Sequence, residues 1–237
     1  MTSTTEATDT WDMVLVHRGF RRDFRMLPAL VRAVTEGDTA RAETVGFHLE
    51  KVADALHHHH TAEDEGLWPR LLQRAPREID PVVQLLAGQH DNLDVLLDDV
   101  DVRLDRWADG ADSADGEALA AVLRQVAVAL YEHMGLEEKL ALPLVERHVF
   151  ATEWEAMIAA GAAGLPPEIG PVLVGMLMYE GGLDAAPPQL RDVLAEVAPK
   201  AYAGYCERLH GTPTPPLSTQ LGLGTPYVGV TVGAGRD

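Results

Sequence analysis

The sequence of 237 residues predicts an all-α protein whose first part is an up-down-up-down four-helix bundle. Two observations lead to this prediction. Hydrophobic residues recur at steps of three and four in four long segments, which is the periodicity of one helix face. The connections between these segments are short, and short connections favour antiparallel neighbours. Hydrophobic residues make up 46% of the chain and charged residues 24%, a composition typical of globular proteins.

The four periodic segments are bounded by ordinary helix start and stop signals, and they cover residues 13–31, 49–67, 83–104 and 119–144. Pro28 lies inside the first segment and predicts a kink or an early end. Asp38 or Thr39 can cap the second helix, because both follow a break in the pattern. The third helix is expected to begin after Pro81, and a loop rich in Gly, Asp and Ser at 109–116 separates it from the fourth.

The composition changes after about residue 150, where Gly and Pro become frequent and the helical stretches become shorter. We therefore divide the chain into a bundle at 10–150, a helical appendage at 151–210 packed on the bundle, and an irregular tail at 211–237. The appendage could close one end of the bundle, form a homodimer contact, or shape a pocket for an organic substrate.

The charge balance excludes several classes of partner. Thirty-seven acidic residues against nineteen basic ones give a formal net charge of −18. Nucleic acid is excluded as a partner because phosphate contacts need basic side chains, and docking on an anionic membrane is disfavoured. The single cysteine, Cys206, allows neither an intrachain disulfide nor a thiolate cage. Because no apolar run reaches membrane-spanning length and the first residues do not resemble a signal peptide, we expect a soluble cytoplasmic protein.

Two segments of the chain align at an offset of 74 residues. Each has a histidine, a glutamate four positions later, a second acid directly after it, and a proline ten positions after the histidine. The matching residues are His59, Glu63, Asp64 and Pro69 in the first segment, and His133, Glu137, Glu138 and Pro143 in the second. Four residues of helix turn through about 400°. Each histidine and its glutamate therefore share one helix face, where they can bind or bridge metal ions.

Six polar residues occupy positions where the hydrophobic pattern asks for Leu or Val: His17, His59, Glu63, His90, His133 and Glu137. An ionised carboxylate buried without a partner costs several kcal/mol, on the order of the desolvation penalty of an ion. A pair of bound metal ions would compensate for two such carboxylates. The alternatives are protonation of both glutamates or a closed hydrogen-bond network of histidine and glutamate without metal.

Nitrogen and carboxylate donors without thiolate suit iron, manganese or zinc, and carboxylates from facing helices of a bundle suit two metals. Two iron ions, cycling between Fe²⁺ and Fe³⁺, are our first choice, because a nitrogen–oxygen site with open positions binds and activates dioxygen or hydrogen peroxide. Zinc would use the same donors, as would manganese.

The order His17, His59-x3-Glu63, His90 and His133-x3-Glu137 on successive helices resembles the hemerythrin-like HHE cation-binding family, over roughly residues 10–150. The pattern is specific because it is doubled, correctly ordered and followed by a proline after each pair. The resemblance implies a non-haem diiron centre in a four-helix bundle, with these six residues as ligands. Members of the family include oxygen carriers and sensors, iron- or redox-responsive regulators, and proteins that consume peroxide or handle nitric oxide.

The sequence departs from the oxygen-carrying hemerythrins at two positions. Asp94 stands where they have a second histidine in the third helix, and the last helix has His133-x3-Glu137 in place of His-x4-Asp. The resulting carboxylate-rich site favours peroxide consumption or oxidase- and oxygenase-like turnover over reversible oxygen carriage. A non-catalytic module that senses or stores oxygen, iron or nitric oxide is the alternative, and whether the protein is an enzyme stays open. A metal-free or zinc-containing structural bundle is a third interpretation.

Several other residues lie near these six in the pattern and differ in their expected roles. His60 adjoins His59 in a run of four histidines and could be an extra ligand or support one, whereas Asp94 could ligate from one turn beyond His90. Asp64 and Glu138 are expected beside the ligands without binding metal. His48 is expected to be a core or channel histidine, and Tyr131 a packing aromatic.

Overall fold

The described residues fold mainly into helices. In the computed structural model, which describes residues 8–163, 169–181 and 195–223, no strand is present among those residues. The prediction of an all-α fold is therefore confirmed. Within the same ranges, no helix is both long and apolar enough to cross a membrane.

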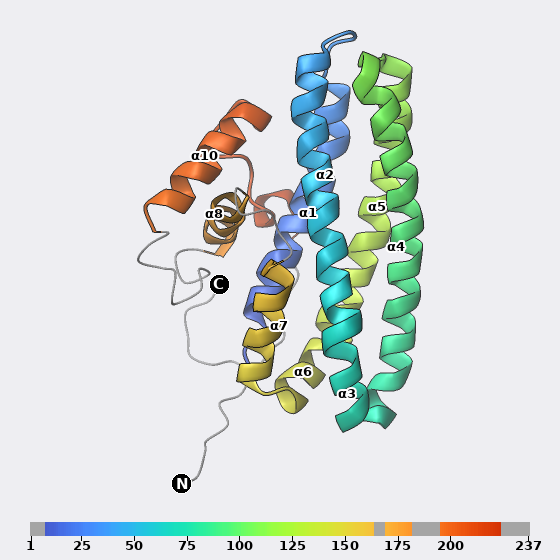
Figure 1. The fold of residues 1–237 in the computed structure, drawn as a ribbon, viewed down its shortest axis with the longest axis vertical. Coiled ribbons are helices and arrows are strands. Elements are labelled where there is room, and N and C mark those ends of the chain that lie inside the picture. Colours follow the sequence, from blue (N-terminus) through green and yellow to red (C-terminus); the bar gives the residue numbers. More distant parts are fainter. Residues whose placement is uncertain (1–7, 164–168, 182–194, 224–237) are drawn as a thin grey trace.

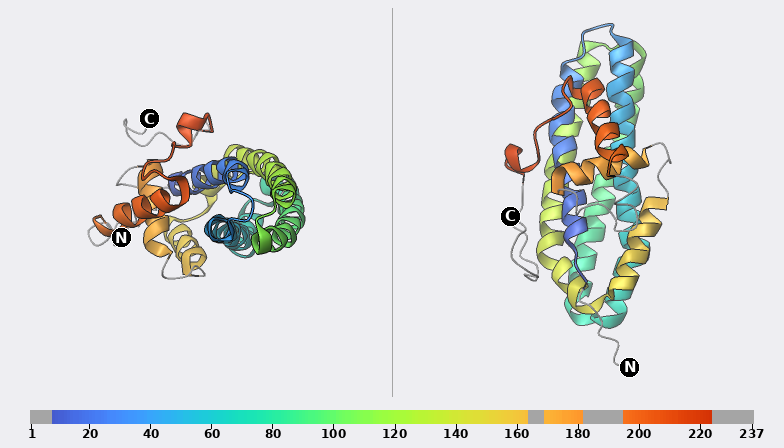
Figure 2. Two further views of the ribbon diagram at one scale, coloured as in Figure 1. Left: turned by 90° about the horizontal axis from the view of Figure 1, so that it is seen from above. Right: turned by 90° about the vertical axis from the view of Figure 1, so that its left-hand side faces the viewer.

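Four long helices lie side by side along the length of the molecule, and each reverses the direction of the one before it (Figure 1). They are α1 (Trp11–Arg32), α2 (Thr39–Ala62), α4 (Pro76–Gly110) and α5 (Ser113–Leu140). Helix α5 packs on α1 and α4, and α2 packs on the same two helices from the opposite side. Seen end-on, the four helices surround a common interior (Figure 2).

The helix ends follow the local sequence signals in most places. Asp38 caps α2 by accepting a hydrogen bond from the Arg41 backbone N–H at 3.0 Å, as expected for a short acidic side chain at this position. Helix α1 continues through Pro28 to Arg32, so the early end does not occur. Helix α4 begins at Pro76, before the start predicted after Pro81, because proline is tolerated in a first turn and burial of Ile79 stabilises the added residues.

The two aligned segments end in similar ways. A π-helical turn, η1 (Glu63–Leu67), follows α2 and leads into α3 (Trp68–Arg74), whereas α6 (Leu142–His148) follows α5. Pro69 and Pro143 lie in the first turns of α3 and α6. The ring of Pro69 obstructs an α-type bond to the carbonyl four residues earlier, and the wider π turn accommodates it. The hydrophobic pattern predicted a regular α-helix up to Leu67. In the structure the regular α-helix ends at Ala62, and the π turn follows.

The buried hydrophobic residues form two clusters, one toward each end of the four-helix body. One contains Phe24, Leu97 and Trp107 among others, and the other contains Leu67, Leu86 and Leu142 among others. On α4, for example, Leu86 belongs to one cluster and Leu93 to the other. The residues between the clusters are the polar ones that interrupt the hydrophobic pattern, so these form a layer across the interior.

The C-terminal helices pack against one side of this body (Figure 1). Helix α7 (Ala151–Ala163) contacts α2, α8 (Gly170–Gly181) contacts α1, and α10 (Val197–His210) contacts α8 and α2. Arg22 of α1 donates to Glu180 of α8 at 2.9 Å, and Glu180 also accepts from the Ser218 hydroxyl at 2.7 Å. A short 3₁₀ helix, η3 (Thr219–Leu221), lies in the part predicted to be an irregular tail, whose residues 224–237 lie outside the described ranges.

Gly175 allows α8 to cross α10 closely, which gives a test of this packing. A Cβ atom at Gly175 would lie 2.6 Å from Tyr202 Cβ and closer still to the Ala198 carbonyl oxygen. We expect Gly175→Ala to lower the free energy of unfolding by about 1–3 kcal/mol, the usual cost of overpacking. The matched control is Gly204→Ala on α10, where the nearest atom lies at 3.8 Å. It should be neutral or stabilising by up to about 1 kcal/mol.

Urea unfolding of both variants measures the difference, and limited proteolysis reports on residues 169–210. Equal unfolding midpoints for the two variants would contradict the close contact.

Candidate metal centre

All six polar residues that interrupt the hydrophobic pattern converge on one site. They come from α1 (His17), α2 (His59), η1 (Glu63), α4 (His90) and α5 (His133, Glu137). Together with His60, they form two groups whose nitrogen and oxygen atoms lie within 4.8 Å of one another inside each group. The first group is His17, His59, Glu63 and Glu137; the second is His60, His90 and His133.

The first group is compact and almost sealed from solvent. The Nε2 atoms of His17 and His59 face each other at 3.2 Å. His59 Nε2 also lies 3.2 Å from Glu63 Oε1, and His17 Nε2 lies 3.3 Å from Glu137 Oε2. His17 and both glutamates have no measurable exposure. Four donor atoms, one each from α1, α2, η1 and α5, therefore surround one small volume.

The two glutamates face histidines of both groups. Glu63 reaches His59 through Oε1 and His90 Nε2 through Oε2, at 3.2 and 3.5 Å. Glu137 Oε2 lies 3.3 Å from His17 Nε2 and 3.7 Å from His133 Nε2. Each carboxylate is thus placed between the two groups, where it could share two metal ions.

Polar side chains contact the Nδ1 atoms of three of the histidines, on the side of each ring that faces away from the site. His17 Nδ1 lies 2.9 Å from Glu138 Oε1, and His90 Nδ1 lies 2.9 Å from Asp64 Oδ2. Because an ionised carboxylate only accepts hydrogen bonds, Nδ1 of each histidine carries the proton of this contact, and Nε2 is directed toward the site. His133 has a longer contact of this kind, 3.4 Å from Nδ1 to Gln89 Oε1. Asp64 and Glu138 therefore orient donors without joining them, as the sequence had predicted.

His60 was not among the residues that the sequence singled out as metal ligands, but the structure places it in the second group. Its ring stacks on the His90 ring with centroids 4.1 Å apart and lies 5.0 Å from the His133 ring. Both of its nitrogen atoms are buried and have no hydrogen-bond partner among the described residues. Helix α2 packs between α1 and α4, so residues about 100° apart on it can face different neighbours. His59 faces α1, and His60 faces α4.

Burial keeps three of the histidines neutral, which is the protonation state that binds metal. Burial lowers the pKa values of His59 and His133 to about 3 and that of His60 well below its usual range. These imidazoles are therefore neutral at pH 7 and keep a free lone pair. Burial, together with the charge of Glu137, raises the pKa of Glu63 well above its ordinary value.

Glu137 behaves in the opposite way to Glu63. Burial alone would raise its pKa, but the neighbouring His17 more than offsets this and holds the Glu137 pKa below its usual range. For His17, burial opposes protonation, yet Glu137 and Glu138 raise the pKa above its ordinary value. A charged pair of His17 and Glu137 beside a protonated Glu63 thus describes the cluster without metal.

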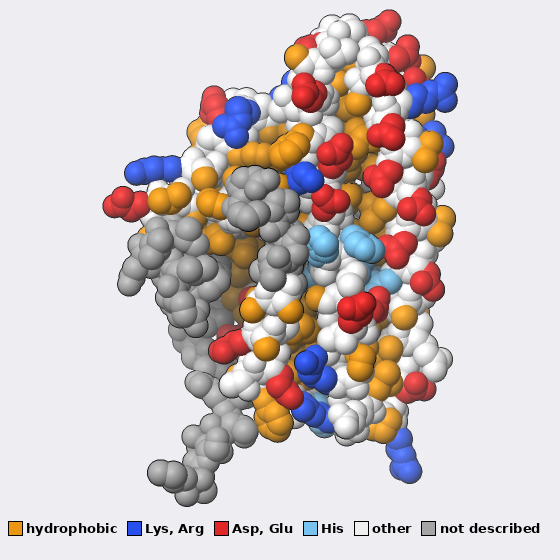
Figure 3. Space-filling model, viewed as in Figure 1, with side chains coloured by type: hydrophobic (Ala, Val, Ile, Leu, Met, Phe, Trp, Pro, Cys, Tyr) orange, Lys and Arg blue, Asp and Glu red, His pale blue; other side chains and the backbone are white. Residues whose placement is uncertain are grey.

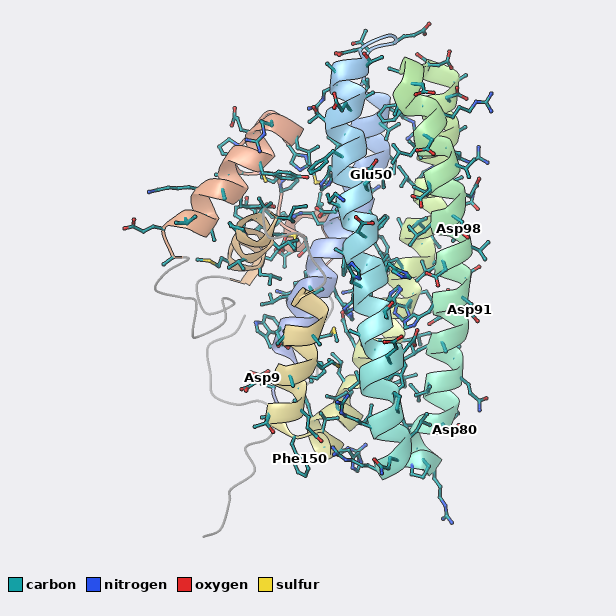
Figure 4. All side chains as sticks on the ribbon, in the orientation of Figure 1. Asp9, Glu50, Asp80, Asp91, Asp98 and Phe150 are labelled. Carbon is teal, nitrogen blue, oxygen red and sulfur yellow. The ribbon has the colours of Figure 1, made fainter. Side chains whose placement is uncertain are left out.

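Three other residues that the sequence singled out, Asp94, Tyr131 and His48, lie outside the cluster. Asp94 lines a groove of about 740 Å³ between α2 and α4, with a half-exposed side chain 3.9 Å from His57 Nδ1. Acidic side chains follow this face (Figure 3), and Glu50 and Asp98 line the groove from α2 and α4 (Figure 4). The Tyr131 hydroxyl donates to the Arg21 carbonyl at 3.0 Å, and His48 contacts Tyr205 on α10.

The donor set fits bound metal better than a closed polar core. None of the four carboxylate oxygens of Glu63 and Glu137 accepts a hydrogen bond within the described part of the chain, although all are buried. The same holds for both nitrogens of His60. Buried polar atoms normally have hydrogen-bond partners, so this cluster of carboxylate oxygens and imidazole nitrogens fits a bound cation.

These features define a helical protein with a buried histidine–carboxylate cluster that could hold metal ions. Residues 8–145 match the family model described as the hemerythrin HHE cation binding domain. The chain therefore belongs to this family, and the resemblance read from its doubled His–Glu motif is confirmed. No curated protein and no solved structure gave a match.

His60 can be tested as a seventh donor by comparing it with His58 in the same histidine run. We expect His60→Ala to weaken binding of Fe²⁺ at least about ten-fold, since even residues behind metal ligands commonly contribute that much. His58→Ala should bind metal like the wild type. Anaerobic Fe²⁺ titration, with metal analysis after desalting, gives both values. Unchanged Fe²⁺ affinity in His60→Ala would show that His60 does not bind the metal.

Glu63→Gln should affect the metal-free and metal-loaded proteins in opposite directions. Without metal, folding raises the pKa of Glu63, so ionisation opposes folding at pH 7 and the neutral amide should stabilise by roughly 1–3 kcal/mol. This advantage should shrink as the pH falls below the ordinary glutamate pKa of 4.5, where both states are protonated. With metal bound, the wild type should be the more stable protein.

Urea unfolding with and without chelator, at acidic and neutral pH, measures this reversal. A Glu63→Gln variant that is destabilised without metal would instead support a metal-free structural network.

Proposed function

We propose that residues 10–150 form a hemerythrin-type up-down-up-down bundle that holds two iron ions and reacts with dioxygen or hydrogen peroxide. The observation that carries this proposal is the placement of Glu63 and Glu137, each facing a histidine of both groups. Nitrogen and oxygen donors without thiolate suit iron, and zinc or manganese are the less favoured metals. When bound, the two irons would supply the redox chemistry that the side chains of this chain lack.

The residues of the chain would hold, orient and shield such a pair. His17, His59, Glu63 and Glu137 would bind one iron, and His60, His90 and His133 would bind the other, with the glutamates shared between them. Glu138 and Asp64 keep the protons of two histidines on Nδ1, so that Nε2 stays available. The hydrophobic clusters on either side of the polar layer keep bulk water away from it.

The two groups differ in composition, which makes the two metal positions inequivalent. The first group has two histidines and the second has three, because His60 has no counterpart in the aligned segment. The equivalent residue there is Met134, which is buried in a hydrophobic cluster. With His60 the donor set has five histidines, so the expectation of turnover rests on coordination positions left open for a small ligand, and not on a carboxylate-rich composition.

Reaction of the anaerobic Fe²⁺ protein with hydrogen peroxide tests the proposal. We expect sustained consumption of peroxide with release of dioxygen, because donors that hold iron without filling every position leave room for a small ligand. Glu137→Ala should lose both iron and activity, and His58→Ala should lose neither. An oxygen electrode and the optical spectrum follow the reaction.

Mixing the same protein with dioxygen separates the other interpretations. A stable oxygenated spectrum, without consumption of peroxide, would favour a module that senses or stores oxygen, iron or nitric oxide. Failure to retain any iron after reconstitution would contradict the diiron proposal. A homodimer contact through residues 151–210 stays a prediction.

A further inference from the structure

A second cavity lies away from the polar cluster, between the four-helix body and the C-terminal helices. It measures about 70 Å³ and is bounded by α1 and α2 on one side and by α8 and α10 on the other. Most of the wall is apolar, from Phe20, Val52, Leu173, Met176 and Leu209 among others. None of the seven residues of the two donor groups lines it. The Phe20 ring lines this cavity and lies 5.5 Å from the His59 ring of the first group.

The charged side chains in the cavity wall are already paired within the protein. Arg22 donates to Asp23 at 3.0 Å and to Glu180 at 2.9 Å. Lys51 donates to Asp54 at 2.8 Å. A charged ligand would lose its hydration on entering the cavity. No charged side chain among the described residues of the wall is free to pair with it, so its binding is unfavourable. The wall thus favours a neutral molecule.

Two histidines in the wall have unused hydrogen-bonding capacity. His48 is only 5% exposed, and its Nδ1 lies 2.9 Å from the Tyr205 hydroxyl. Its Nε2 has no partner among the described residues, and the same is true of His210 Nδ1. Burial lowers the pKa of His48, and it lowers the pKa of His210 to about 4. Both rings are therefore neutral at pH 7, and each can donate or accept a hydrogen bond.

We propose that this cavity binds a small neutral organic molecule with a short apolar body and a single hydroxyl or carbonyl group. The polar group would bond to His48 Nε2, and the apolar part would contact Leu173 and Met176. A volume of about 70 Å³ is several times the roughly 10–15 Å³ that one water molecule needs, so the cavity has room for a molecule such as a short-chain alcohol. Binding requires neither iron nor the reaction proposed above.

A series of linear primary alcohols, from methanol to 1-hexanol, is a direct probe of size and chemistry. Methyl NMR spectra of the metal-free protein and of the iron-loaded protein would follow Met176 and Leu173. We expect saturable shifts at both residues, with affinity that rises along the series and then falls once the chain exceeds the cavity. Propionate and propylammonium should bind at least about ten-fold more weakly than 1-propanol, because neither charge finds a free partner.

Variants separate this cavity from the rest of the protein. Val172→Trp should fill the cavity and abolish alcohol binding, whereas Val128→Trp, at a position 69% exposed on α5, should leave it unchanged. His48→Leu should weaken 1-propanol about ten-fold, which corresponds to one lost hydrogen bond. The same variant should still bind xenon, an apolar probe, like the wild type.

The outcomes distinguish this proposal from the metal function. Saturable alcohol binding to the metal-free protein supports the cavity as a ligand site even if the chain retains no iron. Shifts confined to exposed methyl groups, equal binding of propionate and 1-propanol, or unchanged 1-propanol affinity in His48→Leu would each overturn it. Iron loading and peroxide activity that persist without alcohol binding would leave the metal function standing alone.

Discussion

The burial of two glutamates in the middle of a hydrophobic interior is the constraint to which the rest of this structure responds. Glu63 and Glu137 are fully buried, and their oxygens accept no hydrogen bond within the described residues. Such groups are costly in a medium of low dielectric constant. All four long helices contribute histidines around them, and hydrophobic clusters close the interior on either side. A site of this kind destabilises the metal-free fold and, in return, increases the affinity for a cation.

The internal repeat explains how a single chain builds such a site from both halves. The second acid of each repeat supports a histidine on a helix of the other half: Asp64 bonds to His90, and Glu138 bonds to His17. Each half therefore orients a donor of the other, so the donors reach their positions only when the halves pack together. His60 departs from this symmetry, and it gives the second group an imidazole that the first group lacks.

The C-terminal helices depend on a different set of contacts. Glu180 joins Arg22 of α1 to Ser218 near the end of the described chain, which holds α8 against the four-helix body. At Gly175, α8 crosses α10 closely, and α10 also contacts α2. The cavity beside His48 is a product of this packing, and Phe20 in its wall lies 5.5 Å from the His59 ring.

Local sequence patterns were sufficient to predict the helical class, the family and the six polar residues of the hydrophobic seam, because helical periodicity and the spacing of a motif are local properties. They could not determine that His60 faces inward, since that depends on α2 packing against α4 as well as α1. The exclusion of Asp94 from the cluster likewise depends on how α2 and α4 pack against each other. The cavity beside His48 joins residues more than 150 positions apart, as the contact of His48 with Tyr205 shows, so only tertiary packing creates it.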